Sequence, residues 1–187
     1  NDFARPTVHA RILFLSSVAM YDALAIYYGT HTYLIGNWIN GFESNFEGFI
    51  PIEDTNSSLS RAISYAMYRL LIHRFKNSPG AQESIERFDF IMDQFNYDTA
   101  ISSTDYLSGD AAALGNYIAQ TIIEYGLNDN SRAATGYDNA FYSPVNPSLE
   151  LNSSDNGYTG IIDPNRWQPL KFSTFVDQSG NLISESV

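Results

Sequence analysis

Apolar residues recur at helical spacing in four segments of the chain. The first segment runs from Pro6 to Tyr28 and is broken by Gly29. Pro6 suits a first helical turn, because that position needs no N–H donor. One stripe is formed by Val8, Ile12, Leu15, Ala19, Asp22 and Ile26. The other faces are also apolar, through Leu13, Phe14, Val18, Met20, Tyr21 and Leu24. A helix that is apolar all round is typical of a buried position, so the pattern predicts a central, mostly buried helix.

Two further helices follow an irregular, aromatic-rich segment from Gly29 to Thr55 that contains four glycines and Pro51. The second helix has Asn56, Ser57 and Ser58 as capping candidates. Its core positions are predicted at Leu59, Ile63, Ala66, Leu70 and Phe75. The third helix follows the turn at 77–80 and reaches about Phe95. Its inward positions are predicted at Ile85, Phe88, Met92 and Phe95.

A fourth helix is predicted from about Asp110 to Tyr125, with Gly126 as its left-handed cap. Its inward residues are predicted at Leu114, Ile118, Ile122 and Tyr125. Beyond a short helical turn near 131–135, no sustained periodicity remains, and four prolines interrupt the last fifty or so residues. We therefore expect an all-α helical bundle with a long irregular carboxy-terminal arm. Residues 1–135 form the core of about four main helices, and residues 136–187 extend as an arm over the core or over protein outside this chain.

Charge and cysteine content exclude several function classes. The 187 residues carry 10 Lys and Arg against 21 Asp and Glu, a formal net charge of −11. Nucleic-acid binding depends on clustered Lys and Arg, so a nucleic-acid partner is not expected. The absence of cysteine rules out disulfides, thiolate metal sites and cysteine nucleophiles. The uncharged stretch from Ala23 to Phe42 is long enough to cross a bilayer, but its Gly and Asn residues argue against a membrane span.

Asp22 falls on the apolar stripe of the first helix. A buried carboxylate needs a partner, and Arg69 or Arg74 of the second helix is the expected one. We interpret the pair as structural, with a catalytic acid as the open alternative. Arg11 lies on nearly the same stripe, three turns away, and is also expected to be structural.

The remaining polar residues do not form a catalytic pattern. His9, His31 and His73 are scattered and lack metal-ligand spacing, so no transition-metal site is expected. The acidic residues Glu86, Asp89 and Asp93 of the third helix are interpreted as a solvated face. No nucleophile elbow, phosphate loop or dinucleotide fingerprint is present. The sequence therefore yields no catalytic, cofactor-binding or metal-binding residue.

Two short motifs leave alternatives open. The segment Asn152-x-Ser154-x-Asn156-Gly157, with Gly160 and Asp163, matches the positions of a calcium loop. It has only one carboxylate and no flanking helices, so an Asn/Gly turn is the preferred interpretation and weak calcium binding the alternative. Asn56 and Asn152 each begin a formal glycosylation sequon, which is informative only for a secreted eukaryotic protein.

Several short sequence segments resemble segments of bacterial proteins related to vanadium-dependent haloperoxidases. The first is Asp2 to Arg11, followed by Ala19 to Ala23. The others, in order, are 68–75, Leu114-Gly115-Asn116 with 122–126, 142–147 and Asp163 to Leu170. The resemblance implies the all-α fold that these enzymes share with type-2 phosphatidic acid phosphatases. In that superfamily, Lys and Arg donors hold vanadate or phosphate, and histidine ligates or attacks it.

The catalytic motifs of that superfamily are absent here. They are a Lys followed seven residues later by Arg-Pro, then Pro-Ser-Gly-His, then Ser-Arg with a His six residues further on. Lys171 has Gln178 at the required position, and Pro147-Ser148 continues into Leu149. Ser60-Arg61 and Ser131-Arg132 are followed at that spacing by Met67 and Asp138. No catalytic residue can therefore be transferred, and truncation or loss of activity are the two explanations.

Two hypotheses of function follow. In the first, the chain is the amino-terminal helical portion of a haloperoxidase-like or phosphatase-like protein. It is inactive alone, and its main partner is the remainder of its own polypeptide, which holds the vanadate or phosphate. In the second, it is a noncatalytic helical scaffold whose aromatic arm docks on a partner. A homo-oligomer stays open, and the halide and organic substrate are not indicated. The acidic, cysteine-free composition and a trimmed-looking start favour export from a bacterial cell, to the periplasm or beyond.

Overall fold

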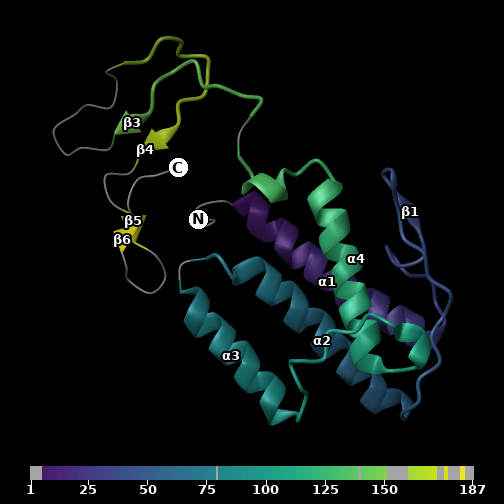
Figure 1. Cartoon of the computed structure of the whole chain (residues 1–187). Helices are drawn as coiled ribbons and strands as arrows, with labels where there is room; N and C mark the ends of the chain where they lie inside the picture. Colours follow the sequence, from purple (N-terminus) through teal and green to yellow (C-terminus); the bar gives the residue numbers. More distant parts are fainter. Residues whose placement is uncertain are drawn as a thin grey trace. The chain divides into compact units, whose positions relative to one another are not determined.

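The computed structural model describes residues 6–78, 80–138, 140–150, 160–171, 175–176 and 182–183 (Figure 1). The chain divides into two compact units, one covering Asp2–Tyr137 and the other Asp138–Val187 together with Asn1. The first unit contains helices α1 (Pro6–Tyr28), α2 (Thr55–Phe75), α3 (Ala81–Gln94) and α4 (Ala111–Asn128). Its minor elements are the strands β1 (Trp38–Ile39) and β2 (Phe42–Glu43) and the 3-10 turns η1 (Tyr106–Ser108) and η2 (Ala133–Thr135). The predicted all-α fold is confirmed.

Helix α2 packs against each of the other three helices, and its contact with α4 is the most extensive (Figure 1). Small residues allow this close approach. A Cβ atom at Gly115 would lie 2.3 Å from the Ala62 carbonyl oxygen and 2.7 Å from Cβ of Tyr65. A side chain of any size at position 115 would therefore separate the two helices.

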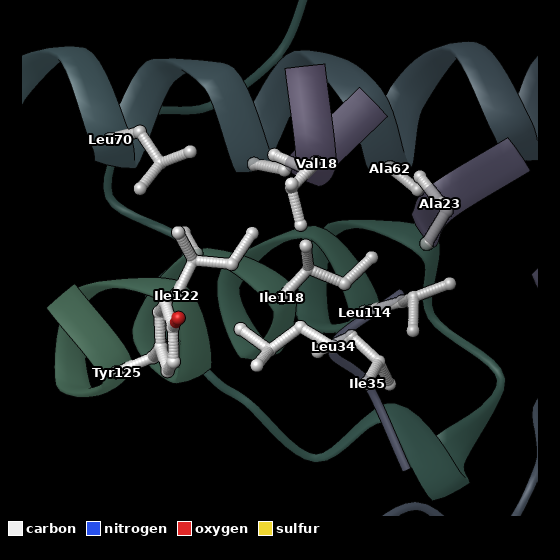
Figure 2. Packing of buried hydrophobic residues seen from close by; sticks show 14 residues of the cluster. Val18, Ala23, Leu34, Ile35, Ala62, Leu70, Leu114, Ile118, Ile122 and Tyr125 are labelled. Atoms are coloured by element: carbon white, nitrogen blue, oxygen red, sulfur yellow. The ribbon is translucent and has the colours of Figure 1, made fainter. Parts of the chain in front are cut away.

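The main core lies between α1, α2 and α4. Buried side chains from these helices meet Leu34 and Ile35 of the loop that follows α1 (Figure 2). The labelled members in Figure 2 are Val18, Ala23, Leu34, Ile35, Ala62, Leu70, Leu114, Ile118, Ile122 and Tyr125. A second cluster joins α2, α3 and the first turn of α4 through Tyr65, Tyr68, Met92 and Ala112. Helix α3 thus packs on the far side of α2 from the main core.

Helix boundaries agree with the sequence patterns except at three points. The N-cap of α2 is Asp54, whose carboxylate accepts from the amides of Asn56 and Ser57, so the predicted Asn and Ser caps are wrong. Helix α4 continues to Asn128, so Gly126 is a helical residue and not a left-handed cap. Helix α3 ends at Gln94, and Phe95 is 61% exposed instead of facing the core.

The second unit has no helix among its described residues. Strand β3 (Leu149–Glu150) pairs in parallel with β4 (Leu170–Lys171), and β5 (Phe175–Val176) pairs antiparallel with β6 (Leu182–Ile183). These strands are two residues long, and the other described residues of this unit lie in turns, bends and irregular backbone. This is the irregular arm that the aperiodic sequence predicts.

Candidate functional site

Asp22 is fully buried, with an exposed fraction of 0%. Its carboxylate accepts three backbone N–H bonds from the loop that follows α1. Oδ1 accepts from Tyr33 at 2.5 Å, and Oδ2 accepts from Leu34 and Ile35 at 2.9 Å each. Hydrogen bonds to an ionised acceptor are strong, and together they satisfy the buried carboxylate. Asp22 therefore anchors this loop to α1, and the predicted ion pair with an arginine of α2 is wrong.

Arg69, one of the two expected partners of Asp22, instead binds the segment between α3 and α4. Its Nε donates to Oδ1 of Asn116 at 2.9 Å, and Nη2 donates to the carbonyls of Thr99 at 2.8 Å and Ile101 at 2.6 Å. Asn116, itself 4% exposed, donates to the carbonyls of Ile101 and Ser103 at 2.9 Å. This polar cluster fixes the 99–103 segment across α2 and α4. Its only sequence signal was an amide on the apolar face of α4.

Arg11 joins α1 to the carboxy-terminal end of α4. Its guanidinium forms an ion pair with Asp129 and donates from Nη2 to the Gly126 carbonyl at 2.9 Å. A Cβ atom at Gly126 would lie 3.0 Å from Nη2 of Arg11, so a glycine inside α4 gives the guanidinium room. A glycine at a position that resembles a helix end in the sequence therefore lies inside the helix, next to the end of the Arg11 side chain.

A small, mainly apolar pocket lies beside this ion pair, between α1, α2 and α4, and it includes Arg11, His73 and Arg74. Partial burial lowers the pKa of His73, although the residue still reaches solvent, and the charge of Lys76 lowers it further. Burial also lowers the pKa of Arg74, whose guanidinium stacks over Phe75 at 5.5 Å from the ring centroid. Arg74 is thus the second expected partner of Asp22 that lies elsewhere. Arg11 already has its counter-ion in Asp129, so the pocket does not resemble three donors arranged around one oxyanion.

The three histidines lie on α1, on the loop after α1 and on α2, and each is exposed. Within the described parts of the chain, no group of three or more His, Asp or Glu residues could hold a metal ion. A vanadate or phosphate pocket requires Lys and Arg donors next to a histidine. Arg11 and Arg74 line one pocket with His73, but Arg11 is already paired with Asp129, so this pocket does not fit the oxyanion pocket that the resemblance implies.

The acidic residues of α3 divide into two kinds. Glu86 and Asp93 are exposed, as the interpretation of a solvated face requires. Asp89 departs from it, because Oδ1 accepts a 2.7 Å hydrogen bond from the Tyr68 hydroxyl on α2. Burial raises the pKa of Tyr68, and the hydrogen bond and charge of Asp89 raise it further. Asp89 thus helps to hold α3 against α2.

The first sequon lies at the start of α2, and its hydroxyl is used by the fold. Ser58 is fully buried, and its Oγ lies 2.6 Å from the hydroxyl of Tyr27. Burial raises the pKa of Tyr27 to about 12, although the Ser58 hydrogen bond acts in the opposite direction. In the folded chain the Ser58 hydroxyl is inaccessible. Asn152 of the second sequon lies outside the described residues.

Asn146 organises the described part of the arm, and the sequence analysis did not single it out. Its side-chain nitrogen donates to the carbonyls of Asp163 at 2.8 Å and Arg166 at 2.9 Å. Its oxygen accepts from the amides of Ile162 and Asp163, both at 2.8 Å. Asn146 is 2% exposed. The hydrogen bonds of Asn146 therefore join two of the sequence segments that carry the family resemblance, 142–147 and 163–170. A polar residue between two nearby prolines is the only sequence signal.

The calcium loop cannot be followed through its first half, because positions 152–157 lie outside the described residues. Asp163, the single carboxylate of that motif, is described. Its Oδ1 accepts a 2.9 Å hydrogen bond from the amide of Asn165, which closes a local turn. Its backbone is bound by Asn146.

Helix α1 has an exposed apolar face, so the prediction of a mostly buried helix is wrong for the described part of the chain. The other helices cover one side of α1 only. From position 13 onward its exposed residues are Leu13, Phe14, Ser17, Met20, Tyr21, Leu24 and Tyr28, which we call the α1 stripe. Leu13 is 69% exposed and Tyr28 is 67% exposed. The stripe contains no charged residue.

By length and composition, α1 is also the one helix in the described segments that could cross a membrane. A core helix of a globular protein has the same length and composition, so these two properties do not separate the cases. The stretch from Ala23 to Phe42 considered above is not one helix: α1 ends at Tyr28, and the β1–β2 hairpin follows.

Comparison with known proteins places the fold. No protein-family model matches the chain, and no curated protein sequence matches it. Among solved structures, a helical fold of the same kind is found in an enzyme. That structure is an apo-type bacterial vanadium-dependent chloroperoxidase, which superposes with a TM-score of 0.57 and 19% sequence identity over 88% of this chain. The match covers 32% of that enzyme, so this chain spans about a third of its length. At this identity the likeness shows the fold alone.

Proposed function

We propose that this chain is the amino-terminal helical portion of a vanadium haloperoxidase-like or acid phosphatase-like protein. In this proposal it supports a vanadate or phosphate pocket whose binding residues lie in the remainder of the same polypeptide. The observation that carries the proposal is the fold likeness to a vanadium-dependent chloroperoxidase over 88% of this chain. The sequence segments between Asp2 and Leu170 that resemble the family add support, because they occur in order along the chain.

The contacts of the basic residues support a structural role for this portion. Arg11 is paired with Asp129, and Arg61 with Glu53. Arg69 is bound to Asn116 and to two backbone carbonyls. A guanidinium already bound in this way would have to give up protein contacts in order to hold an oxyanion. The proposal therefore assigns the oxyanion donors to residues outside 1–187.

Activity of the complete reading frame tests this proposal. The complete protein and residues 1–187 are each assayed with orthovanadate, hydrogen peroxide and bromide for bromination of a chlorinated dione, and separately for hydrolysis of a phosphomonoester. We expect one of the two activities in the complete protein and neither in residues 1–187. His73→Ala in the complete protein serves as the control and should retain the activity, because His73 is assigned no chemistry.

The alternative is a noncatalytic helical scaffold, for which the exposed α1 stripe would be the interaction surface. A contiguous apolar face on a helix marks an interaction surface whether or not the protein is an enzyme. A complete protein that shows neither activity, with or without vanadate, would overturn the enzymatic proposal and leave the scaffold. Export from a bacterial cell remains part of the proposal and is tested by fractionation of the source cells.

A further inference from the structure

The α1 stripe differs in kind from the solvent faces of the neighbouring helices. The exposed positions of α2 are all polar, namely Thr55, Asn56, Ser57, Ser60 and His73. Those of α4 are Gln120, Glu124, Leu127 and Asn128. Six of the seven residues of the α1 stripe, all except Ser17, are large apolar or aromatic side chains that are 41–69% exposed. A helix face that stays in water is normally polar, so this pattern is typical of a covered face.

The spacing of the α1 stripe is that of a helix-packing seam. Leu13, Ser17, Met20 and Leu24 follow one another at intervals of four, three and four residues. Side chains at these intervals form a ridge that fits the groove of a second helix. From Leu13 to Tyr28 the stripe extends for about 22 Å at 1.5 Å per residue. This length matches the contact of one helix lying along α1.

Two polar groups of the α1 stripe already have partners within the chain. The Ser17 hydroxyl donates to the Leu13 carbonyl at 2.8 Å, and the Tyr21 hydroxyl donates to the His31 carbonyl at 2.9 Å. Burial of a polar group is costly when it loses its hydrogen bond to water without replacement. These two hydroxyls would keep their bonds under a partner, so they add little to the cost of covering the stripe.

We infer that the α1 stripe is the docking face for an apolar-faced helix from the part of the same polypeptide outside residues 1–187. This inference rests on the proposed function, and it names the surface through which the two parts join. The similar chloroperoxidase chain is about three times as long as the matched region, which leaves ample chain to supply such a helix. A second copy is disfavoured as the occupant, because each chain carries a net charge of −11 and like charges oppose self-association.

Cysteine labelling tests the inference, because the chain contains no cysteine. Ser17→Cys and Leu24→Cys are placed in the α1 stripe of the complete protein. Ser60→Cys is the matched control, since Ser60 is an exposed serine on α2 with the same substitution. Maleimide labelling of the unsubstituted complete protein gives the background. Ser17→Cys keeps almost the same side-chain size, so the test does not depend on whether Leu24→Cys folds.

In the native complete protein we expect positions 17 and 24 to react at least about tenfold more slowly than position 60, because labelling there requires the covering helix to open. In denaturant all three positions should react at one rate. Equal native rates would overturn the inference. Protection that disappears on dilution, together with a dimer in sedimentation, would also overturn it, because the occupant would be a second copy.

The labelling experiment and the activity assay can fail independently of each other. Slow labelling in a protein without haloperoxidase or phosphatase activity would keep the docking face and remove the proposed chemistry. Fast labelling in an active protein would do the reverse.

Discussion

The carboxylate of Asp22 and the loop amides at 33–35 depend on each other, because each satisfies the other inside the core. We expect Asp22→Ala to lower the free energy of unfolding by about 3 kcal/mol, because three backbone N–H donors, two of them buried, would lose a charged acceptor. Urea unfolding measures the change. Ser17→Ala on the exposed face of the same helix should change it by less than about 0.5 kcal/mol. Equal effects of the two variants would contradict the role assigned to Asp22.

Asp54 gives the second prediction at the scale of a residue. Its hydrogen bonds with Ser57 and Asn56 at the start of α2 hold its pKa below the usual 3.8. A carboxyl whose pKa is lowered on folding stabilises the protein above its unfolded pKa, and this contribution is lost as the pH falls through the folded pKa. Asp54→Ala should therefore lower the melting temperature at pH 6, and the difference from the unsubstituted protein should shrink below pH 3.8.

Thermal melts across this pH range measure the difference. Asp93→Ala is the control, because Asp93 is exposed on α3 and does not cap a helix. A gap at position 54 that stays constant down to the lowest pH would contradict the assignment of Asp54 as a charged cap.

At the scale of elements, the contact between α2 and α4 predicts an effect of unusual sign. In an open helix Gly→Ala stabilises by about 1 kcal/mol, because alanine has the higher helix propensity. At Gly115 the added methyl would meet the backbone of Ala62 and the side chain of Tyr65. We expect Gly115→Ala to destabilise by about 2 kcal/mol or more, through overpacking. Denaturant unfolding measures the sign, and a stabilised variant would show that the helices are further apart.

The arm has its own test at this scale. Asn146→Ala removes hydrogen bonds to and from residues 162, 163 and 166, so the amides of Ile162 and Asp163 should exchange with deuterium at least about tenfold faster. Exchange in the helices of the first unit should not change. Asn165→Ala, which removes a neighbouring exposed amide side chain, is the control. Unchanged exchange at 162 and 163 would mean that Asn146 does not hold the arm together.

The sequence predicts elements better than it predicts contacts, and particular residues show why. Pro6 and Gly29 bracket α1 correctly, because proline and glycine act on the local backbone. The cap of α2 was missed because Asp54, Asn56, Ser57 and Ser58 are all good caps in one short run. The partner of Asp22 was missed because backbone amides carry no sequence signal. Asn146 was missed because its partners lie 16–21 residues away in an aperiodic segment.

At the scale of the whole molecule, the burial of α1 differs from the sequence prediction, because the apolar pattern of a helix does not say which elements cover it. The sequence of α1 predicts a mostly buried helix, while α2 and α4 cover one side of it. Both observations are accounted for together if another part of the polypeptide covers the α1 stripe. The apolar pattern of α1 would then be a property of the complete protein.

The central claim is that this helical portion belongs to an oxyanion-binding protein but does not itself bind the oxyanion. Isothermal titration of orthovanadate into the complete protein and into residues 1–187 tests it most directly. The account predicts saturable binding by the complete protein and none by residues 1–187. Equal binding by both would place the oxyanion donors within this chain, and absence of binding by either would contradict the assignment to the haloperoxidase-like class.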